Sequence, residues 1–466
     1  MADEGSTTEA ATYPRGFARD TDWKWPMVPA RKLVTLNYGR ALKADTRSPG
    51  KVPVFGTNGQ CGWHDAPLAK APGLILGRKG QGPLGVEWCD KDFWVIDTAY
   101  YASTLTSDID LKYLYHLVKY VGLNHLKDGT SNPTLSRDTF GAQLFPVPPL
   151  AEQKAIAAVL AALDDKIELN RRMNATLEAM ARALFQSWFI DFDPVRKNID
   201  RNQPLPQPSP SGRGRSEAEG EGAAGLDFDP VRAKLDGREP AGLDEATAAL
   251  FPEHFEHADD GMLPVGWRHA AIDELCEING WTLGKSDELE TLEYVEISEV
   301  SRGDIANFAS YARGEEPSRA RRRLRHGDTV LSTVRPDRGS YFLALNPPES
   351  RVASTGFAVL TPTNAPWSFI HATMTQSAVF EHLGQMADGG AYPAVRPEVI
   401  AAMKGAIPNE PKVLEAFHRI CAPLFEQAEA NRAQSRTLAT LRDALMPKLL
   451  SGEVSVRGHQ SASSPE

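Results

Sequence analysis

The chain has 466 residues, a formal net charge of −10 at pH 7, and hydrophobic (41%) and charged (24%) fractions typical of a soluble protein. Its length predicts two to four domains, and its acidic balance argues against a histone-like polycation while leaving room for a local DNA-binding face. The four cysteines lie far apart and indicate neither a zinc site nor a disulfide framework.

Residues 1–22 form a polar, acidic N-terminal tail that we expect to be disordered. The tail lacks the pattern of a signal peptide, and no stretch of the chain is long enough to span a bilayer, so we expect a cytoplasmic protein with no membrane contact. The first domain, residues 23–150, combines an amphipathic helix at 111–121 with short apolar runs between Gly and Pro. This pattern predicts a mixed α/β domain with strands near 52–55, 73–76 and 93–96.

Two long helices, at 151–190 and 412–451, carry apolar residues at the alternating 4,3 spacing of a coiled-coil seam. The two seams align at a constant offset of 261 residues, and each places Asn at the same position, where a buried polar side chain fixes register. The first seam comprises Ile156, Leu160, Leu163, Ile167, Asn170, Asn174, Leu177, Ala181, Leu184 and Trp188. The second comprises Phe417, Cys421, Leu424, Ala428, Asn431, Ser435, Leu438, Arg442, Leu445 and Leu449.

The repeat extends upstream of each helix, because the turn at 128–133 matches the turn at 388–393. The second domain, residues 263–411, again shows strand-like runs (291–297, 329–333 and 356–360) and a helix around 368–386. Between the halves lies a linker, 191–262, in which one hexapeptide occurs at 191–196 and again at 227–232, around a low-complexity insertion. The tail at 452–466 is expected to be disordered. The chain is therefore a duplication of one module, a globular domain followed by a long helix.

Candidate chemistry is sparse. Five arginines between 319 and 325 suit phosphate oxygens or guanine, although Glu315 and Glu316 could neutralise them instead. The loop at 77–82 places two cations between glycines. Glycines would allow the backbone to approach a polyanion closely, but a simple hairpin turn explains them as well. A motif at 346–349, Asn-Pro-Pro-Glu, is similar to the Asn-Pro-Pro-Tyr motif of amino-methyltransferases, but a Pro-rich turn is the favoured interpretation. No catalytic residues, metal ligands or phosphate loop can be proposed.

Several segments match the pattern of one known family: Phe145 to Ile156, which leads into the first long helix, Leu184 to Val195, which closes it, and shorter stretches at 75–80, 96–101 and 263–267. On these segments the chain resembles the specificity subunits of Type I restriction-modification systems. Two departures stand out: the insertion after the first helix, and the turn at 407–411, which keeps one Pro of the Pro-Pro-Leu-x-Glu-Gln motif and has no Gln.

The resemblance implies an α+β fold with two mixed α/β target recognition domains in pseudo-twofold repeat, separated by two long helices that form an antiparallel coiled coil. It implies double-stranded DNA, two methylation subunits and restriction subunits as partners. S-adenosylmethionine, ATP and Mg²⁺ would be used by those partners, and this chain would be a non-catalytic recognition subunit without a cofactor or metal.

Site candidates follow from charge and loop position, supported where the family motif matches. The DNA-binding candidates are Asn58, Arg78, Lys79, Gln81, Tyr100 and Lys127 in the first domain, and Arg319, Arg321, Arg322, Arg323, Arg325, Arg335 and Arg338 in the second. The coiled-coil and partner-binding candidates are Ile156, Leu163, Ile167, Asn170, Leu177, Leu184, Leu424, Asn431, Leu438 and Leu445.

A helix from about 152 to 189 would be about 55 Å long at ~1.5 Å per residue, or ~16 base pairs at ~3.4 Å per step. We therefore expect the helices to set the gap between two half-sites. Three alternatives stay open: a standalone pseudo-dimeric DNA-binding regulator, a methyltransferase centred on Asn346, and a coiled-coil scaffold that does not bind DNA.

Overall fold

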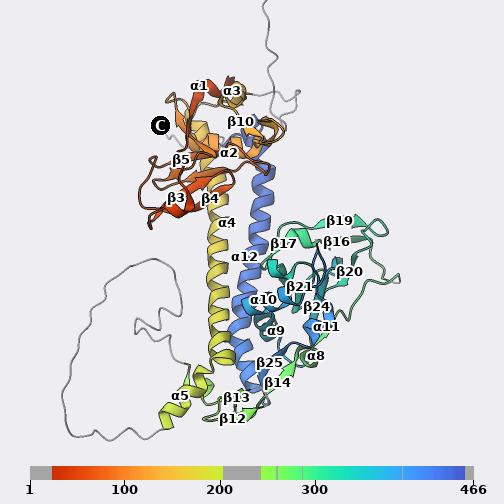
Figure 1. Cartoon of the computed structure of the whole chain (residues 1–466). Coiled ribbons are helices and arrows are strands. Elements are labelled where there is room, and N and C mark those ends of the chain that lie inside the picture. The colour runs from red at the N-terminus through yellow and green to blue at the C-terminus, as the bar shows by residue number, and fades with distance from the viewer. Residues whose placement is uncertain (1–23, 203–242, 259–260, 286, 391, 457–466) are drawn as a thin grey trace, which may run out of the picture. The chain divides into compact units, whose positions relative to one another are not determined.

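The computed structural model describes residues 24–202, 243–258, 261–285, 287–390 and 392–456. The chain packs as two compact units, one formed by residues 1–168 with 434–466 and the other by residues 169–433. Both boundaries fall inside the long helices, so each unit contains one α/β domain and one end of each helix (Figure 1). The expected fold class, mixed α/β domains with paired long helices, is confirmed.

The first unit is built on a four-stranded antiparallel sheet with the strand order β2-β8-β5-β6 and a three-stranded sheet with the order β4-β3-β7. In the second of these sheets β3 pairs with β7 in parallel. The elements are β1 (Met27–Pro29), α1 (Ala30–Leu33), β2 (Val34–Tyr38), η1 (Ala44–Thr46), β3 (Val52–Gly56), β4 (Gly59–His64), β5 (Gly73–Gly77), β6 (Val86–Cys89), β7 (Trp94–Val95), β8 (Ala99–Thr104), α2 (Leu111–Val121), η2 (Asn124–Leu126), β9 (Lys127–Asp128), β10 (Thr134–Leu135), α3 (Arg137–Ala142), β11 (Leu144–Pro146) and α4 (Leu150–Phe185).

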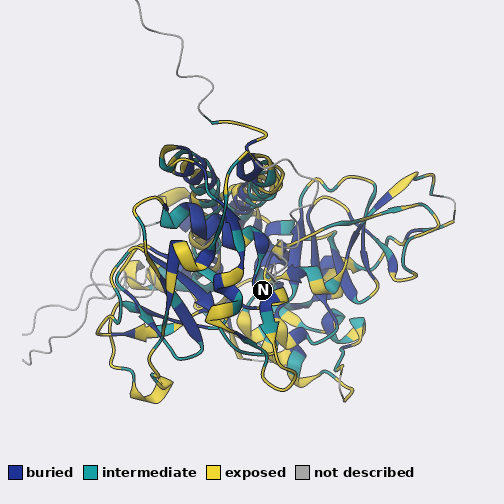
Figure 2. Ribbon diagram, turned by 90° about the horizontal axis from the view of Figure 1, so that it is seen from above, coloured by how far each residue is buried: buried dark blue, intermediate teal, exposed yellow. Residues whose placement is uncertain are grey.

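Local sequence explains the main elements of this unit. All five residues of β5 are buried, as expected for a strand covered on both faces. Helix α2 begins where the Asp110 side chain accepts a hydrogen bond from the Tyr113 amide, and it ends at Gly122, which adopts a positive φ of 72°. The apolar face of α2 packs on β5 and β6 and is continuous with a core that includes Ile156 and Leu449 of the long helices. In Figure 2 the buried residues gather on strands and helices, whereas most loops are exposed.

The second unit repeats this topology. Its sheet β15-β24-β21-β22 corresponds to β2-β8-β5-β6, and its parallel pair β16-β23 corresponds to β3-β7. The elements are η3 (Gln186–Ile190), α5 (Asp193–Asn202), α7 (Glu245–Ala248), β12 (Phe255–Ala258), β13 (Gly261–Pro264), β14 (Trp267–Ala271), α8 (Ile272–Leu275), β15 (Cys276–Ile278), β16 (Thr291–Val295), η4 (Ile297–Glu299), β17 (Val300–Ser301), β18 (Asp304–Ile305), β19 (Ala309–Ala312), β20 (Ala320–Arg323), β21 (Asp328–Ser332), η5 (Pro336–Arg338), β22 (Tyr341–Ala344), β23 (Arg351–Ser354), β24 (Phe357–Pro362), α9 (Trp367–Met374), α10 (Ser377–Gln385), α11 (Pro397–Ala401), β25 (Lys404–Pro408) and α12 (Lys412–Ser451).

The structure differs from the sequence prediction at two helices. The single helix expected around 368–386 is two helices, α9 and α10, because the side chains of Thr375 and Gln376 donate hydrogen bonds to the carbonyls of His371 and Ala372 and end the first helix. The first long helix is α-helical only to Phe185 and continues as a π-helical turn, η3. Trp188 and Phe189 of this turn are buried against Phe417 and Trp267.

The linker predicted at 191–262 contains ordered structure where it is described, namely α5, α7 and a hairpin of β12 with β13 that extends to Pro264. The tail at 1–22, most of the low-complexity insertion, the second hexapeptide copy at 227–232 and most of the tail at 452–466 lie outside the described residues.

Helices α4 and α12 pair in antiparallel fashion, and every residue of both predicted seams is buried or half-buried (Figure 1). Within the second unit the seam is polar at its asparagines. Asn170 Nδ2 donates to the Asn431 carbonyl at 3.2 Å, Asn174 Nδ2 donates to the Ala428 carbonyl at 3.0 Å, and Asn431 Nδ2 donates to Asn174 Oδ1 at 2.9 Å. These hydrogen bonds tie the two helices together at one register.

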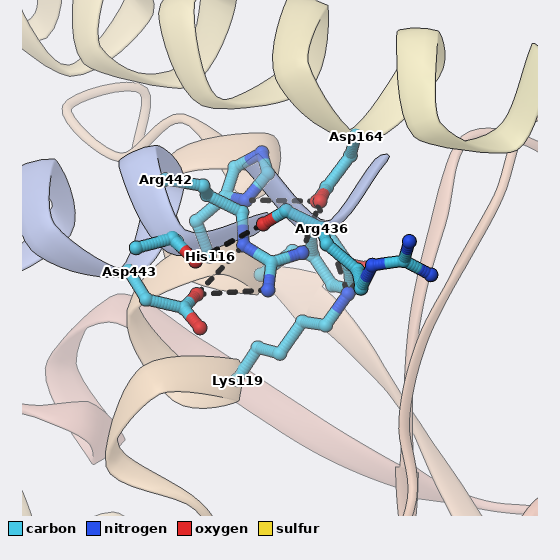
Figure 3. Close-up of polar contacts among 8 residues, drawn as sticks. His116, Lys119, Asp164, Arg436, Arg442 and Asp443 are labelled. Carbon is cyan, nitrogen blue, oxygen red and sulfur yellow. Dashed lines mark hydrogen bonds and ion pairs between the residues drawn. The ribbon is translucent and has the colours of Figure 1, made fainter. Parts of the chain in front are cut away.

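Within the first unit, a polar cluster around the buried His116 joins α2 to the long helices (Figure 3). Asp164 Oδ1 of α4 lies 2.6 Å from Arg442 Nη1 of α12, and Asp164 Oδ2 lies 3.8 Å from His116 Nδ1 of α2 and from Lys119 Nζ. The His116 side chain is fully buried, and this burial lowers the pKa of His116 to about 4. The imidazole is therefore neutral at physiological pH even though a carboxylate lies nearby.

Candidate nucleic-acid interface

In the first domain, three segments meet at the carboxyl end of β5 and form what we call the first corner: the turn at 57–58, the loop at 78–82 and the turn at 128–133. Thr57 Oγ1 donates to the carbonyls of Lys79 (2.8 Å) and Thr98 (3.1 Å). Lys127 Nζ donates to the carbonyls of Gly80 (3.3 Å) and Gly82 (2.9 Å), and Gln81 Nε2 donates to the Ser131 carbonyl (2.8 Å). The loop is thus held in place by side chains from its neighbours and by its own Gln81.

Glycine is required at two positions of the first corner. A Cβ atom at Gly77 would lie 2.2 Å from the Thr57 carbonyl oxygen, and Gly80 has a φ of 140°. Gly77 therefore allows close packing against the adjacent turn, and Gly80 allows the turn conformation of the loop, which agrees with the structural explanation that the sequence left open.

Two cations on this loop are directed by hydrogen bonds of their own. Arg78 Nη1 donates to the Asp97 carbonyl at 3.0 Å, and Lys79 Nζ lies 2.9 Å from Asp97 Oδ2. The predicted contribution of Tyr100 to DNA contact is wrong. Tyr100 is only 1% exposed, and its hydroxyl donates to the Leu135 carbonyl, because β8 is an internal strand of the sheet. Asn58 is exposed at the tip of the β3-β4 turn.

The second domain has an equivalent second corner, formed by residues 333–339 with the turn at 388–393. The amides of Arg78 and Thr333 donate to the carbonyls of Thr98 and Gly356, both at 2.9 Å. The amides of Gly80 and Arg335 likewise donate to the carbonyls of Pro133 (3.0 Å) and Pro393 (2.8 Å). The same backbone frame therefore carries different side chains in the two domains.

The side chains at the second corner are cationic and aromatic. Arg335 adopts a positive φ of 47°, and its guanidinium carbon lies 4.8 Å from the centroid of the Tyr392 ring. Tyr392 is 73% exposed, and Arg338 is also exposed. Sequence reasoning found both arginines but missed Tyr392, although the repeat had already aligned its turn with the turn at 128–133.

The arginine run at 319–325 does not form one cationic face. Strand β20 alternates its side chains, and nearby carboxylates pair with the run and with its neighbour Arg313. Arg323 is 8% exposed and lies 2.8 Å from Asp287. Arg321 lies 3.5 Å from Glu316, and Glu316 also pairs with Arg313. Arg325 lies 3.4 Å from Glu277. Arg322 is half-buried, and desolvation lowers the pKa of its guanidinium, whereas Arg319 is exposed. The alternative explanation, neutralisation by neighbouring carboxylates, describes most of this run.

The chemistry available at the two corners is that of binding. Cationic side chains at both corners, and the exposed Tyr392 ring at the second, suit phosphate oxygens and base edges. Asn346 lies on the turn between β22 and β23 with a positive φ of 46°, and its Oδ1 atom lies 2.9 Å from His326 Nδ1. This geometry is that of the Pro-rich turn favoured from the sequence.

Comparison with known proteins gives three concordant results. Residues 24–179 match the family model described as the Type I restriction modification DNA specificity domain. The HindI Type I specificity subunit of Haemophilus influenzae is 26% identical over 349 residues, covering 69% of this chain and 71% of that subunit. The MjaIX Type I specificity subunit of Methanocaldococcus jannaschii is 22% identical over 357 residues, covering 74% and 69% of the two chains.

Among solved structures, the S subunit of a Type I restriction-modification system from M. genitalium matches 94% of this chain and 99% of its own, with a TM-score of 0.53 and 16% identity, which shows a shared fold. No helix in the described part of the chain is both long enough and apolar enough to cross a bilayer.

The chain thus combines a duplicated α/β domain, a cationic corner in each copy and a paired helix from each repeat, an arrangement suited to DNA recognition. Residues 24–179 match the DNA specificity domain of Type I restriction-modification systems, and the chain is similar to Type I specificity subunits over about 70% of its length.

Proposed function

We propose that this chain reads a DNA target in two parts, one with each domain, and supplies sequence choice to a cytoplasmic Type I complex. Two methylation subunits would modify adenine with S-adenosylmethionine, and restriction subunits would use ATP and Mg²⁺ to cleave DNA. The observation that supports the proposal is the repeated corner, in which one backbone frame presents different side chains in each domain. Two unlike reading surfaces on one frame suit a target with two unlike half-sites.

The helix pair would set the spacing between the half-sites. Helix α4 contains 36 residues and α12 contains 40, which corresponds to about 54 and 60 Å at ~1.5 Å per residue. The asparagine hydrogen bonds fix the register of the pair, and a fixed register is required if helix length is to determine a distance.

The proposal is tested by mapping adenine methylation across the genome in cells that carry this chain with its methylation partner and in cells that lack the chain. We expect a split motif, two short sequences separated by a fixed gap of undefined bases, only where the chain is present. An identical methylation pattern in both cells would contradict the proposal. Tight, specific DNA binding by the chain alone, without methylation subunits, would favour the standalone regulator.

A further inference from the structure

The ring of Tyr38, at the end of β2, is 50% exposed and has two arginines within cation–π distance. The guanidinium carbon of Arg78 lies 4.8 Å from the ring centroid, and that of Arg137 lies 4.7 Å from it. The three residues come from three elements: β2, the loop after β5, and the first residue of α3. We call this group the Tyr38 clamp.

Each member of the clamp is positioned by a separate interaction. Arg78 donates to the Asp97 carbonyl. Helix α3 is fixed at its start by Ser136, whose hydroxyl oxygen accepts a hydrogen bond from the Thr139 amide at 2.9 Å. The Tyr38 ring packs against the buried ring of Tyr100, with 5.2 Å between the centroids. The two guanidinium groups are therefore held beside one ring by the fold.

Stability alone gives a weak reason for this arrangement. A cation over an aromatic ring at an exposed site contributes only about 0.5–1 kcal/mol, and two like charges near one ring repel each other. The nearby Asp97 carboxylate is paired with Lys79, and among the described residues no carboxylate pairs with Arg78 or Arg137. An anion bound by both guanidinium groups would offset this repulsion.

We propose that the Tyr38 clamp binds the phosphate backbone of double-stranded DNA and positions the first domain on its half-site. Guanidinium groups bind phosphate oxygens through charge-assisted, often bidentate hydrogen bonds, and the half-exposed ring fixes their direction. This inference rests on the proposed function and adds the residues that bind the DNA backbone. Such interactions set register and orientation without reading sequence.

The second domain has no such clamp at the equivalent positions. In the first domain Ile75 of β5 pairs with Tyr101 of β8, and the corresponding pair in the second domain is Val330 of β21 with Val359 of β24. Tyr38 of β2 pairs with Tyr100, the residue before Tyr101. In the second domain Ile278 of β15 pairs with Leu360 of β24, so Gly280, two residues further along the chain, takes the position of Tyr38. Thr333 takes the position of Arg78, because the two amides form equivalent hydrogen bonds. The clamp therefore predicts phosphate binding in the first half-site that has no counterpart in the second.

The test measures DNA binding by the chain in complex with its methylation subunits, by fluorescence anisotropy over a series of salt concentrations. The probes are a duplex carrying the methylated motif and a duplex with that motif scrambled. The variants are Arg137→Gln, Tyr38→Leu and Tyr38→Phe. The control is Lys91→Gln, which removes one exposed cation beside Cys89, at the opposite strand ends of the same sheet from Gly77.

We expect Arg137→Gln to weaken binding to both duplexes by about 3- to 10-fold and to reduce the slope of log K against log salt by about 1. Tyr38→Leu should weaken binding to both duplexes, and Tyr38→Phe should bind like the wild type because it keeps the ring face. Ethylation of individual phosphates should interfere with wild-type binding in both half-sites, and in the Arg137→Gln complex this interference should weaken in the first half-site alone.

Arg137→Gln and Tyr38→Leu complexes that match the Lys91→Gln complex in affinity and salt slope would overturn the clamp. A wild-type complex that does not distinguish the two duplexes would instead contradict the proposed function. Melting temperatures of the variants, measured on the same complexes, separate a weakened DNA interface from an unfolded domain.

Discussion

At the scale of single residues, the type of a side chain did not predict its exposure where strand register determines which residues are covered. Tyr100 and Tyr38 face each other across β2 and β8, yet Tyr100 is in the core and Tyr38 is half-exposed. The apolar periodicity of short strands does not show which tyrosine is covered. Likewise, counting arginines between 319 and 325 could not show that Asp287 and Glu277, which lie 36 and 48 positions away from their partners, neutralise two of them.

His116 makes stability depend on pH in the acid range. In the folded chain its pKa is lowered to about 4, first by burial, while the Asp164 carboxylate opposes the shift and the cations Lys112, Lys119 and Arg442 add to it. An unfolded histidine has a pKa of about 6.5, so below that pH the unfolded state binds more protons than the folded state. The contribution of His116 is thus fully present above about pH 6.5 and is lost progressively as pH falls toward 4.

We expect this linkage to remove up to about 3 kcal/mol between pH 6.5 and pH 4. His116→Phe, which fills a similar volume without a titrating group, should lose less stability than the wild type over this range. Urea unfolding at pH values of about 7.5, 6 and 5 checks this expectation, because these values run from above the unfolded pKa into the window between the two pKa values. Parallel pH dependence in the two proteins would show that His116 does not titrate on unfolding. The same measurement on His371→Phe, which replaces a second buried histidine, gives a comparison.

At the scale of elements, the long helices were the most predictable part of the chain. Their seams extend over many heptads, so the sequence pattern outweighs any local propensity. Short elements were less predictable, because their limits depend on side-chain hydrogen bonds such as those of Thr375 and Gln376, which end α9. The corners could be located from the glycine-flanked loop and the repeated turn, but the hydrogen bonds of their side chains could not.

The asparagine layer of the helix pair should cost stability when it is left incomplete. Asn431→Ala removes the partner of Asn174 Oδ1, an oxygen of a buried residue, and of Gln427 Nε2, a nitrogen of an exposed one. We expect a loss of about 1–3 kcal/mol in the free energy of unfolding, measured by urea denaturation. Glu426→Ala, at an exposed position of the same helix, should change stability by less than about 0.5 kcal/mol. Equal losses in both variants would contradict the role of the layer.

At the scale of the whole molecule, duplication was readable because two modules carry aligned turns and seams. The structure adds that the repeat extends to individual backbone hydrogen bonds at the two corners. The sequence did not predict the arginine strand β20, which has no counterpart in the first domain from which to infer it, and it predicted α10 only as part of one longer helix.

The proposed spacing role of the helices makes a quantitative prediction. One heptad inserted between Glu168 and Leu169 and a matching heptad between Ala433 and Gln434 should lengthen the pair by about 10 Å, or ~3 base pairs. We expect the methylated motif to keep both half-sites and to gain undefined bases between them, as read by genome-wide methylation mapping. Insertion into one helix alone should abolish methylation because the seams no longer align. An unchanged gap after the paired insertion would exclude the helices as the spacer.

The shared backbone frame of the two corners also bears on how easily such a protein can acquire a new target. Main-chain amides and carbonyls form the equivalent bonds, and Gly80 in one domain is replaced by Arg335 in the other while the bond to the proline carbonyl is kept. The backbone structure of the corner and the side chains that would contact DNA can therefore vary independently. Variation confined to exposed positions such as Asn58, Arg338 and Tyr392 should yield folded chains with altered sequence preference, which makes these corners the natural places to diversify a library of DNA readers.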